Sequence, residues 1–179
     1  MEARDFSRVR LHKVMAERFS VRDYKDTAIE EEKLNAILEA GRIAPTAANI
    51  QPQRIYVIKS EEGLSKIRAI THCAFNAPVV LMVAYDADKQ WKNPLEEGIC
   101  AGLQDVSIVT TQMMLKAWDL GIGSCWVNHF PPTETAKAFG LPESEKVALL
   151  LPIGYPADDA VPAPMHAKMK DMDDLVKYL

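Results

Sequence analysis

Two arginines and a serine alternate with apolar residues near the start of the chain, in the pentapeptide Arg18-Phe19-Ser20-Val21-Arg22. In an extended segment every second side chain points the same way, so Arg18, Ser20 and Arg22 share one face. Guanidinium groups bind phosphate oxygens through paired hydrogen bonds, and a hydroxyl adds a further donor. The segment therefore has the chemistry of a receptor for a phosphorylated ligand. The alternative is that these residues, at the end of a helix, are only solvated.

A second segment, Ala44–Pro52, combines small residues with two prolines in the sequence APTAANIQP. Small side chains let the backbone approach a flat ligand closely, and Thr46 and Asn49 offer hydrogen bonds to ring heteroatoms. The alternative is an ordinary loop between a helix and a strand.

A third segment, Leu120–His129, reads LGIGSCWVNH. Its glycine-flanked turn leads into a short predicted strand that carries exposed backbone amides and Trp126. The alternatives are that Trp126 packs in the core and that Cys125 is an inert, small apolar residue.

The composition predicts one globular domain over residues 1–179, with 48% apolar and 26% charged residues. The net charge of -4 disfavours a nucleic-acid partner. The three cysteines form no CxxC pair and no ligand cluster with the four histidines, so no metal site is expected. The charged N-terminus is unlike a signal peptide, and no apolar run approaches the ~20 residues of a membrane span. We therefore expect a soluble, cytoplasmic protein.

The sequence pattern places these segments between mixed helices and strands. A continuous apolar run at 78–85 indicates a central strand covered on both faces. The order is not a regular βαβ alternation, and neither G-x-G-x-x-G nor a Walker A loop is present, so an α+β fold is favoured over a doubly wound sheet. Further strands are expected at 54–58, 123–127 and 147–153. Helices are expected at 5–18, from a capping box at Thr27–Glu30 to Pro45, at 61–70, 95–120 and 133–139, with a short amphipathic segment at 172–179.

Together, the Arg-x-Ser-x-Arg, A-P-T-A-A-N-x-Q-P and G-I-G-S-C-W motifs resemble, in order and spacing, the nitroreductase family of FMN-dependent enzymes. The resemblance implies an α+β fold with a mixed sheet, surrounding helices and a two-fold homodimer. It also implies two FMN sites at the subunit interface, each built from both chains. The predicted helix 95–120 resembles the family's dimerisation helix, with Met113, Met114, Leu115 and Trp118 as interface or core residues.

The resemblance assigns cofactor-binding roles to residues in all three segments, and it names no catalytic residue. Arg18 and Ser20 resemble the phosphate and ribityl contacts, beside Phe19, and Arg22 the cation near the pyrimidine edge of the flavin. Lys168 and Lys170 resemble a basic pair that completes the phosphate site, with a solvated basic patch as the alternative. The segments expected against the isoalloxazine are Pro45, Thr46, Ala47 and Asn49 of the partner chain, and Trp126, Val127, Asn128 and His129 with an amide donor to N5.

The activity that this resemblance implies is a two-step transfer, in which NADH or NADPH gives a hydride to FMN and a nitroaromatic, quinone or flavin acceptor is then reduced. His129 stands where the family often has a small residue; it is either a proton donor to the substrate or a structural, solvent-facing residue. Little chain lies between Asp86 and Leu95 to build the helical excursion of larger members, so an open pocket is expected. The alternatives are a specialised flavoenzyme of this fold, an FMN carrier or redox sensor without catalysis, and an interaction module that binds no flavin.

Overall fold

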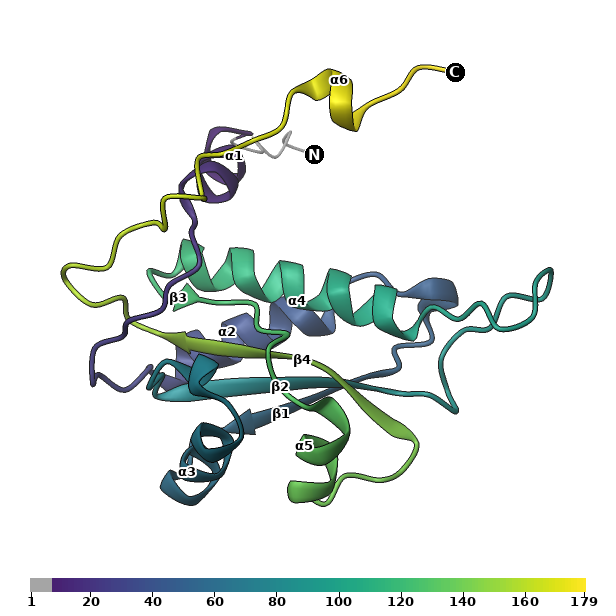
Figure 1. Cartoon of the computed structure of the whole chain (residues 1–179), viewed down its shortest axis with the longest axis horizontal. Helices are drawn as coiled ribbons and strands as arrows, with labels where there is room; N and C mark the ends of the chain where they lie inside the picture. The colour runs from purple at the N-terminus through teal and green to yellow at the C-terminus, as the bar shows by residue number, and fades with distance from the viewer. Residues whose placement is uncertain (1–7) are drawn as a thin grey trace, which may run out of the picture.

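The computed structural model describes residues 8–179, and its centre is a four-stranded sheet with helices on both faces (Figure 1). The strands lie in the order β1-β2-β4-β3, and each neighbouring pair is antiparallel. Their bounds are Gln53–Ile58 for β1, Val79–Asp86 for β2, Gly123–Ser124 for β3 and Glu145–Gly154 for β4. The described sheet is therefore antiparallel, whereas the resemblance implied a mixed sheet; the one parallel pairing among the described residues is an isolated bridge between Ser20 and Ser124, of which Ser20 lies outside the named strands.

Helices α2 (Glu31–Arg42) and α4 (Gly102–Asp119) cover one face of the sheet, and α3 (Glu61–Ile70) and α5 (Pro132–Ala138) cover the other (Figure 1). The central strand β2 supplies alternate residues to two apolar cores. Val79, Leu81 and Val83 belong to the core beside α2 and α4. Val80, Met82 and Ala84 belong to the core beside α3 and α5. The predicted central strand covered on both faces is confirmed.

Helix α4 is shorter than the predicted helix 95–120, because it begins only at Gly102. The chain before it forms a projecting loop in which Lys92 bridges Cys100 and the Asn93 amide donates to the Ile99 carbonyl at 2.9 Å. Pro94 cannot donate a backbone hydrogen bond, and Gly98 has a φ of +84°, so neither residue suits a helix here. The apolar residues that suggested a longer helix are therefore exposed, with Leu95 at 92%.

The predicted capping box at the start of α2 is wrong. The helix begins at Glu31, and its N-cap residue Glu30 makes no side-chain capping bond. Glu30 instead accepts from the Tyr155 hydroxyl at 2.5 Å and from Lys33 Nζ at 3.2 Å, which ties the helix to the end of β4. Ile43 caps the C-terminal end of the helix and is 64% exposed.

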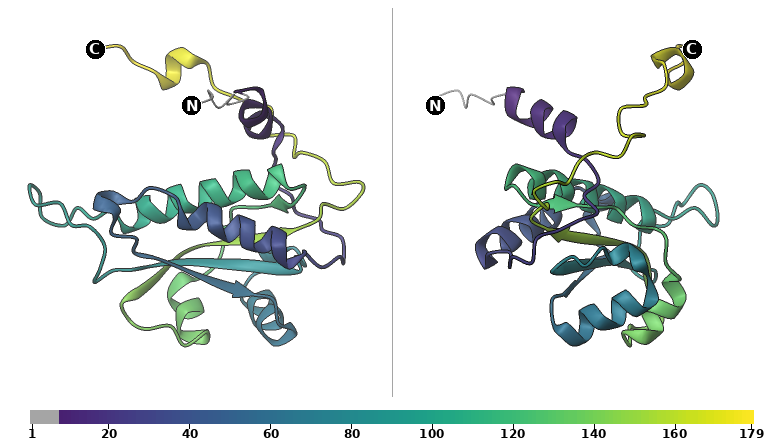
Figure 2. Two further views of the ribbon diagram at one scale, coloured as in Figure 1. Left: turned by 180° about the vertical axis from the view of Figure 1, so that it is seen from behind. Right: turned by 60° about the vertical axis from the view of Figure 1, so that its left-hand side comes forward.

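The two ends of the chain stand away from the sheet and its helices (Figure 2). Helix α1 (Arg8–Glu17) leads directly into segment 18–22. Residues 5–7 of the predicted helix 5–18 lie outside the described range. The C-terminal tail contains one short helix, α6 (Met172–Leu175), where a longer segment was expected. Both ends carry exposed apolar side chains: Leu11, Met15, Met165, Met169, Met172, Leu175 and Tyr178.

Two 3-10 turns complete the described elements: η1 (Ala47–Asn49) and η2 (His72–Ala74). No helix of residues 8–179 has both the length and the apolar content that a bilayer span requires.

Candidate functional site

The segment 18–22 runs alongside β3, just beyond the C-terminal end of α4. The Val21 amide donates to the Ser124 carbonyl at 3.0 Å, and Val21 is fully buried. Ser20 and Arg22 lie on the other side of the segment, where Arg22 Nη1 approaches the Ser20 carbonyl at 3.4 Å. A Cβ on Gly123 would lie 2.6 Å from Val21, so only glycine permits this close approach. The predicted alternation of inward and outward side chains is therefore present.

Tyr24 holds the same segment against β4 from beneath. Its hydroxyl donates to the carbonyls of Val21 at 2.8 Å and Pro152 at 3.2 Å. Burial of the ring raises the pKa of the Tyr24 phenol far above its usual range, so the hydroxyl stays a donor. No local pattern points to this positioning role, because both acceptors are backbone carbonyls, one of them more than a hundred residues away.

A pocket of about 310 Å³ opens beside this segment. It is lined by Phe19, Ser20 and Arg22 and by residues 159–161 and 163 at the start of the C-terminal tail. Phe19 packs edge-on against Trp118, with ring centroids 5.3 Å apart, and also meets His166 of the tail at 6.5 Å. Two carboxylates, Asp23 and Asp159, line the pocket as well.

Lys168 and Lys170 are exposed and do not line this pocket, although they follow His166 closely in the chain. The described structure therefore brings Ser20 and Arg22 together but leaves the two lysines outside.

The segment 44–52 has a strained backbone. Ala48, Asn49 and Gln51 have φ values of +51°, +53° and +57°, in the left-handed region that costs a non-glycine residue about 1–2 kcal/mol. The conformation is held by Thr46 Oγ1, which accepts from the Gln51 amide at 3.0 Å, and by the Gln51 side chain, which donates to Asn49 at 3.0 Å. Strained residues of this kind cluster at binding sites, where the surrounding structure maintains them.

Asp105 in the first turns of α4 anchors this strained loop. Its Oδ1 accepts from the Ala47 amide at 2.8 Å, and the side chain is only 2% exposed. Its second oxygen, Oδ2, is buried and has no partner among the described residues, and neither has the buried Oε1 of Gln53 just after the loop. Buried acceptors of this kind are normally paired, so the surroundings of the loop are suited to a further donor.

The segment 124–129 crosses the edge of the sheet formed by β4. Val127 and Leu150 exchange two backbone hydrogen bonds of 2.9 and 3.1 Å, and the side chains of Cys125 and Val127 are buried. Trp126 is half-buried and packs against the core beside α2 and α4, and its indole Nε1 donates to Asn128 Oδ1 at 3.0 Å. Burial raises the pKa of the Cys125 thiol, which fits an inert core residue. Only Gly123–Ser124 of the predicted strand 123–127 is regular.

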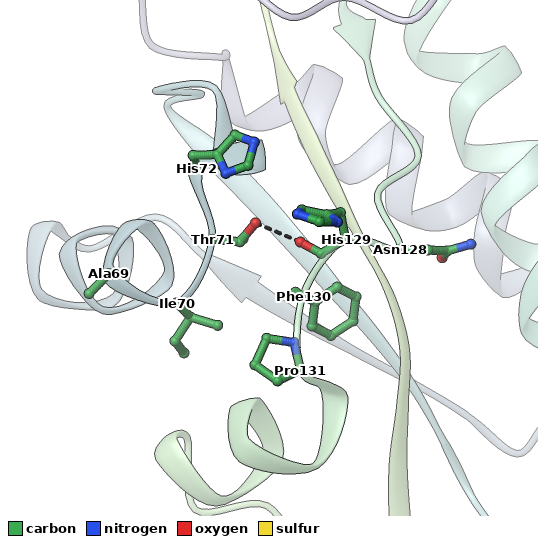
Figure 3. A pocket seen from close by; sticks show the side chains of 8 residues that line it. All are labelled: Ala69, Ile70, Thr71, His72, Asn128, His129, Phe130 and Pro131. Carbon is green, nitrogen blue, oxygen red and sulfur yellow. Dashed lines mark hydrogen bonds between the residues drawn. The ribbon is translucent and has the colours of Figure 1, made fainter.

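A second pocket, of about 470 Å³, lies at the far end of this segment between α3 and α5 (Figure 3). His72 of η2 and His129 approach each other across it, with ring centroids 5.4 Å apart. The Thr71 hydroxyl donates to the His129 carbonyl at 2.7 Å and joins the two walls. His72 was not singled out from the sequence, because nothing local links it to a residue 57 positions further along the chain.

The loop 44–52 and the segment 18–22 lie at opposite ends of α4 in one chain. The loop is anchored to Asp105 near the start of the helix, whereas Ser20 pairs with Ser124 beyond its end. The helical rise of about 1.5 Å per residue puts roughly 22 Å between these ends. One chain therefore cannot close both segments around one flavin ring.

Residues 8–179 also contain no group of three or more ligand side chains that could hold a metal ion.

Comparison with known proteins identifies the fold. The sequence profile of the Nitroreductase family matches residues 15–76 and 72–155. A relative from Archaeoglobus fulgidus, provisionally named NADH dehydrogenase/NAD(P)H nitroreductase, is 35% identical over 154 residues, which are 82% of this chain and 86% of the relative. The crystal structure of a nitroreductase family protein from Clostridium difficile 630 superposes with a TM-score of 0.86 at 36% identity, over 93% of this chain and 96% of that one.

A further structure, an FMN-dependent nitroreductase from Clostridium difficile R20291, has 26% identity and a TM-score of 0.71 over 91% of this chain and 93% of that one. The architecture is thus the α+β fold of nitroreductase family proteins. The chain belongs to the Nitroreductase family.

Proposed function

We propose that this chain is an FMN-dependent oxidoreductase that takes a hydride from NADH or NADPH and reduces a small acceptor such as a nitroaromatic, a quinone or a flavin. Family membership supports the class of reaction. The observation that carries the proposal is a continuous strip of backbone, the polar strip, made of segments 18–22 and 124–129, that begins at the Ser20–Ser124 bridge and ends at the His129 pocket. Its exposed or half-buried polar side chains include Ser20, Arg22, Asn128 and His129. An extended stretch from Ser124 to His129 spans at most about 17 Å, which suits an elongated ligand with an anionic end and a planar end.

The phosphate of FMN fits the start of this strip. Arg18 and Arg22 form no ion pair with any described residue, so both guanidinium groups are available to a ligand. Arg18 and Ser20 hold the phosphate and ribityl chain in this proposal, next to Phe19, and Arg22 lies toward the pyrimidine edge of the ring. The nearby carboxylates Asp23 and Asp159 favour a position for the phosphate on the Arg18 side.

The ring of FMN fits along Trp126, Val127, Asn128 and His129, on the outer side of the segment. When bound, FMN supplies the hydride chemistry, accepting two electrons from the nicotinamide and releasing them to the acceptor. The chain's own residues bind and orient it, and Arg22 favours the negative charge of its reduced form. The nicotinamide and the acceptor bind in turn at this same strip, each against the flavin.

The strained loop of a second copy completes each site. With two chains related by a two-fold axis and their α4 helices antiparallel, the loop of each chain meets the segment 18–22 of the other. Pro45, Thr46, Ala47 and Asn49 then contact the partner's flavin. The exposed Leu103 (56%) and Ile108 (42%) on α4, and the apolar side chains of α1 and the tail, support such a homodimer. Lys168 and Lys170 reach the phosphate in this proposal once the tail is seated on the partner.

Mixed dimers test the two-chain site directly. Arg18→Ala and Asn49→Ala each damage both sites of a homodimer, but a mixed dimer of the two variants contains one intact site and one doubly altered site. The expected result is that mixed dimers recover about half of the wild-type FMN content, while each homodimer stays low. If verified mixed dimers recovered no FMN content, the two-chain site would be contradicted: either one chain supplies both residues to a site, or neither residue contacts FMN.

Steady-state kinetics test the reaction class. Because donor and acceptor use the site in turn, double-reciprocal plots against NADPH at several acceptor concentrations should give parallel lines. Converging lines would contradict the alternating mechanism. Tight FMN binding without reduction by either nicotinamide would favour the carrier or redox-sensor role.

We also infer a single domain over the whole chain and, from its three free thiols, a cytoplasmic location.

A further inference from the structure

Two histidines from separate elements face one pocket at the ring end of the polar strip. His72 belongs to η2 after α3, and His129 precedes α5 (Figure 3). Their rings meet edge to face, with centroids 5.4 Å apart and planes inclined at 64°. Both side chains are exposed, so each can exchange protons with water. His129 is therefore one member of a pair and not an isolated surface histidine.

The backbone segments that carry both histidines are tied together by Thr71, which is only 6% exposed. Its hydroxyl donates to the His129 carbonyl at 2.7 Å and accepts from the Cys73 amide at 3.1 Å. One buried side chain thus ties the backbone on either side of His72 to the backbone of His129. This arrangement holds two imidazoles on opposite walls of a preformed cavity of about 470 Å³.

The pocket walls combine polar and apolar surface, and the polar share is the larger. Ile70, Phe130 and Pro131 offer apolar surface to a planar ring, and Asn128 lies at the edge toward Trp126. Among the described lining residues the two histidines are the only ionisable side chains; Cys73, next to His72, packs against the core beneath α3. The pocket therefore suits an aromatic molecule whose oxygen atoms accept hydrogen bonds from imidazole N–H groups.

We propose that His72 and His129 bind the oxygen atoms of a quinone or nitroaromatic acceptor and that one of them supplies the proton that completes its reduction. This inference rests on the proposed function, because the reduced cofactor supplies the hydride. A quinone that takes up a hydride, two electrons and one proton, retains one anionic oxygen. An imidazolium N–H bond breaks, an O–H bond forms at that oxygen, and the neutral hydroquinone leaves. The imidazole then recovers a proton from water.

Separate measurement of the two half-reactions tests this role. His72→Gln and His129→Gln keep an amide donor but cannot deliver a proton at neutral pH, and His12→Gln on α1 is the matched control. General acid catalysis typically contributes about 10²–10⁴-fold. The double variant, loaded with FMN, should therefore reoxidise with benzoquinone at least about 100-fold more slowly than wild type, whereas its reduction by NADPH, which takes no proton from the protein, should slow far less.

A binding measurement without turnover gives an independent readout. In ¹⁵N-labelled protein with oxidised FMN, p-nitrobenzoate should shift the imidazole signals of His72 and His129 and leave that of His12 unchanged. Unshifted His72 and His129 signals, or wild-type reoxidation of the double variant, would overturn the assignment. A wild-type protein that binds no FMN or is not reduced by a nicotinamide would instead contradict the proposed function, so the two failures are distinguishable.

Discussion

Strain in the loop 44–52 makes an unusual prediction for Ala48. This residue has φ and ψ of 51° and 21°, which costs alanine about 1–2 kcal/mol, whereas glycine adopts the conformation freely. Glycine has a more flexible unfolded chain, which offsets about 0.5–1 kcal/mol of this gain. Ala48→Gly should therefore stabilise the protein without FMN by about 1 kcal/mol. For a chain of this size, that corresponds to a rise in Tm of roughly 2–4 °C.

The same substitution should weaken FMN binding if the strained loop is preorganised for the ligand. Ordering one additional flexible residue on binding costs about 1 kcal/mol, which raises Kd roughly 5-fold. The assays are thermal unfolding of the FMN-free protein at fixed concentration and fluorescence titration with FMN, because bound ligand would itself raise Tm.

Ala47→Gly is the matched control, since Ala47 is adjacent and lies outside the left-handed region. It should lower Tm by roughly 1–4 °C. A fall in Tm for Ala48→Gly as large as that of the control would refute the strain argument. A rise in Tm with unchanged FMN affinity would show that the strain does not serve this ligand.

Three further substitutions test the phosphate contacts, the dimer interface and the acid sensitivity. Arg18→Ala should weaken FMN binding about 10- to 100-fold through loss of a charged hydrogen bond, with circular dichroism unchanged. Met114→Lys should shift gel-filtration elution toward the monomer, because the half-buried Met114 lies on α4. Glu30→Gln should lower Tm at pH 7 but not near pH 2. Hydrogen bonds from Tyr155 and Lys33 lower the pKa of the Glu30 carboxyl from 4.5 to about 2, so its contribution is present above pH 4.5 and is lost as pH falls toward 2.

Each of these tests has a control or an outcome that contradicts it. Lys59→Ala, which removes an exposed charge elsewhere, should leave FMN affinity intact, and equal losses in both variants would remove the phosphate assignment. Ile108→Lys, at a 42% exposed position with no core role, should also break the dimer if Met114→Lys fails to fold. Wild-type elution of Ile108→Lys would count against α4 as the interface. A Tm difference for Glu30→Gln that persists at pH 2 would contradict the linkage argument.

Elements defined by local pattern were predicted well from the sequence. The helix expected at 61–70 has the bounds of α3, and the apolar runs at 78–85 and 147–153 correspond closely to β2 and β4. Continuous apolar strands and an amphipathic helix carry their signal within a few residues, because burial on one or both faces fixes the residue types. The predicted bounds were wrong mainly at the ends of elements. Before α4, for example, the apolar residues suit a helix, but the backbone forms a paired loop instead.

In the candidate site, too, the features with a local sequence signal were predicted and those that depend on distant residues were not. The alternation of Ser20, Val21 and Arg22 is a local property and is present in the structure. The strain at Ala48 and the anchoring by Asp105 were not foreseen, since alanine carries no chemical signal and Asp105 lies 58 positions from its partner. Pairings between distant segments arise only when the sheet and helices bring them together.

The visible spectrum of purified protein, reconstituted with FMN and recorded anaerobically before and after NADPH, and then NADH, tests the proposed flavin chemistry. The prediction is a protein-bound flavin spectrum that bleaches rapidly with at least one nicotinamide and returns on addition of benzoquinone. A colourless protein that takes up no FMN, or a bound flavin that neither nicotinamide reduces, would contradict the claim.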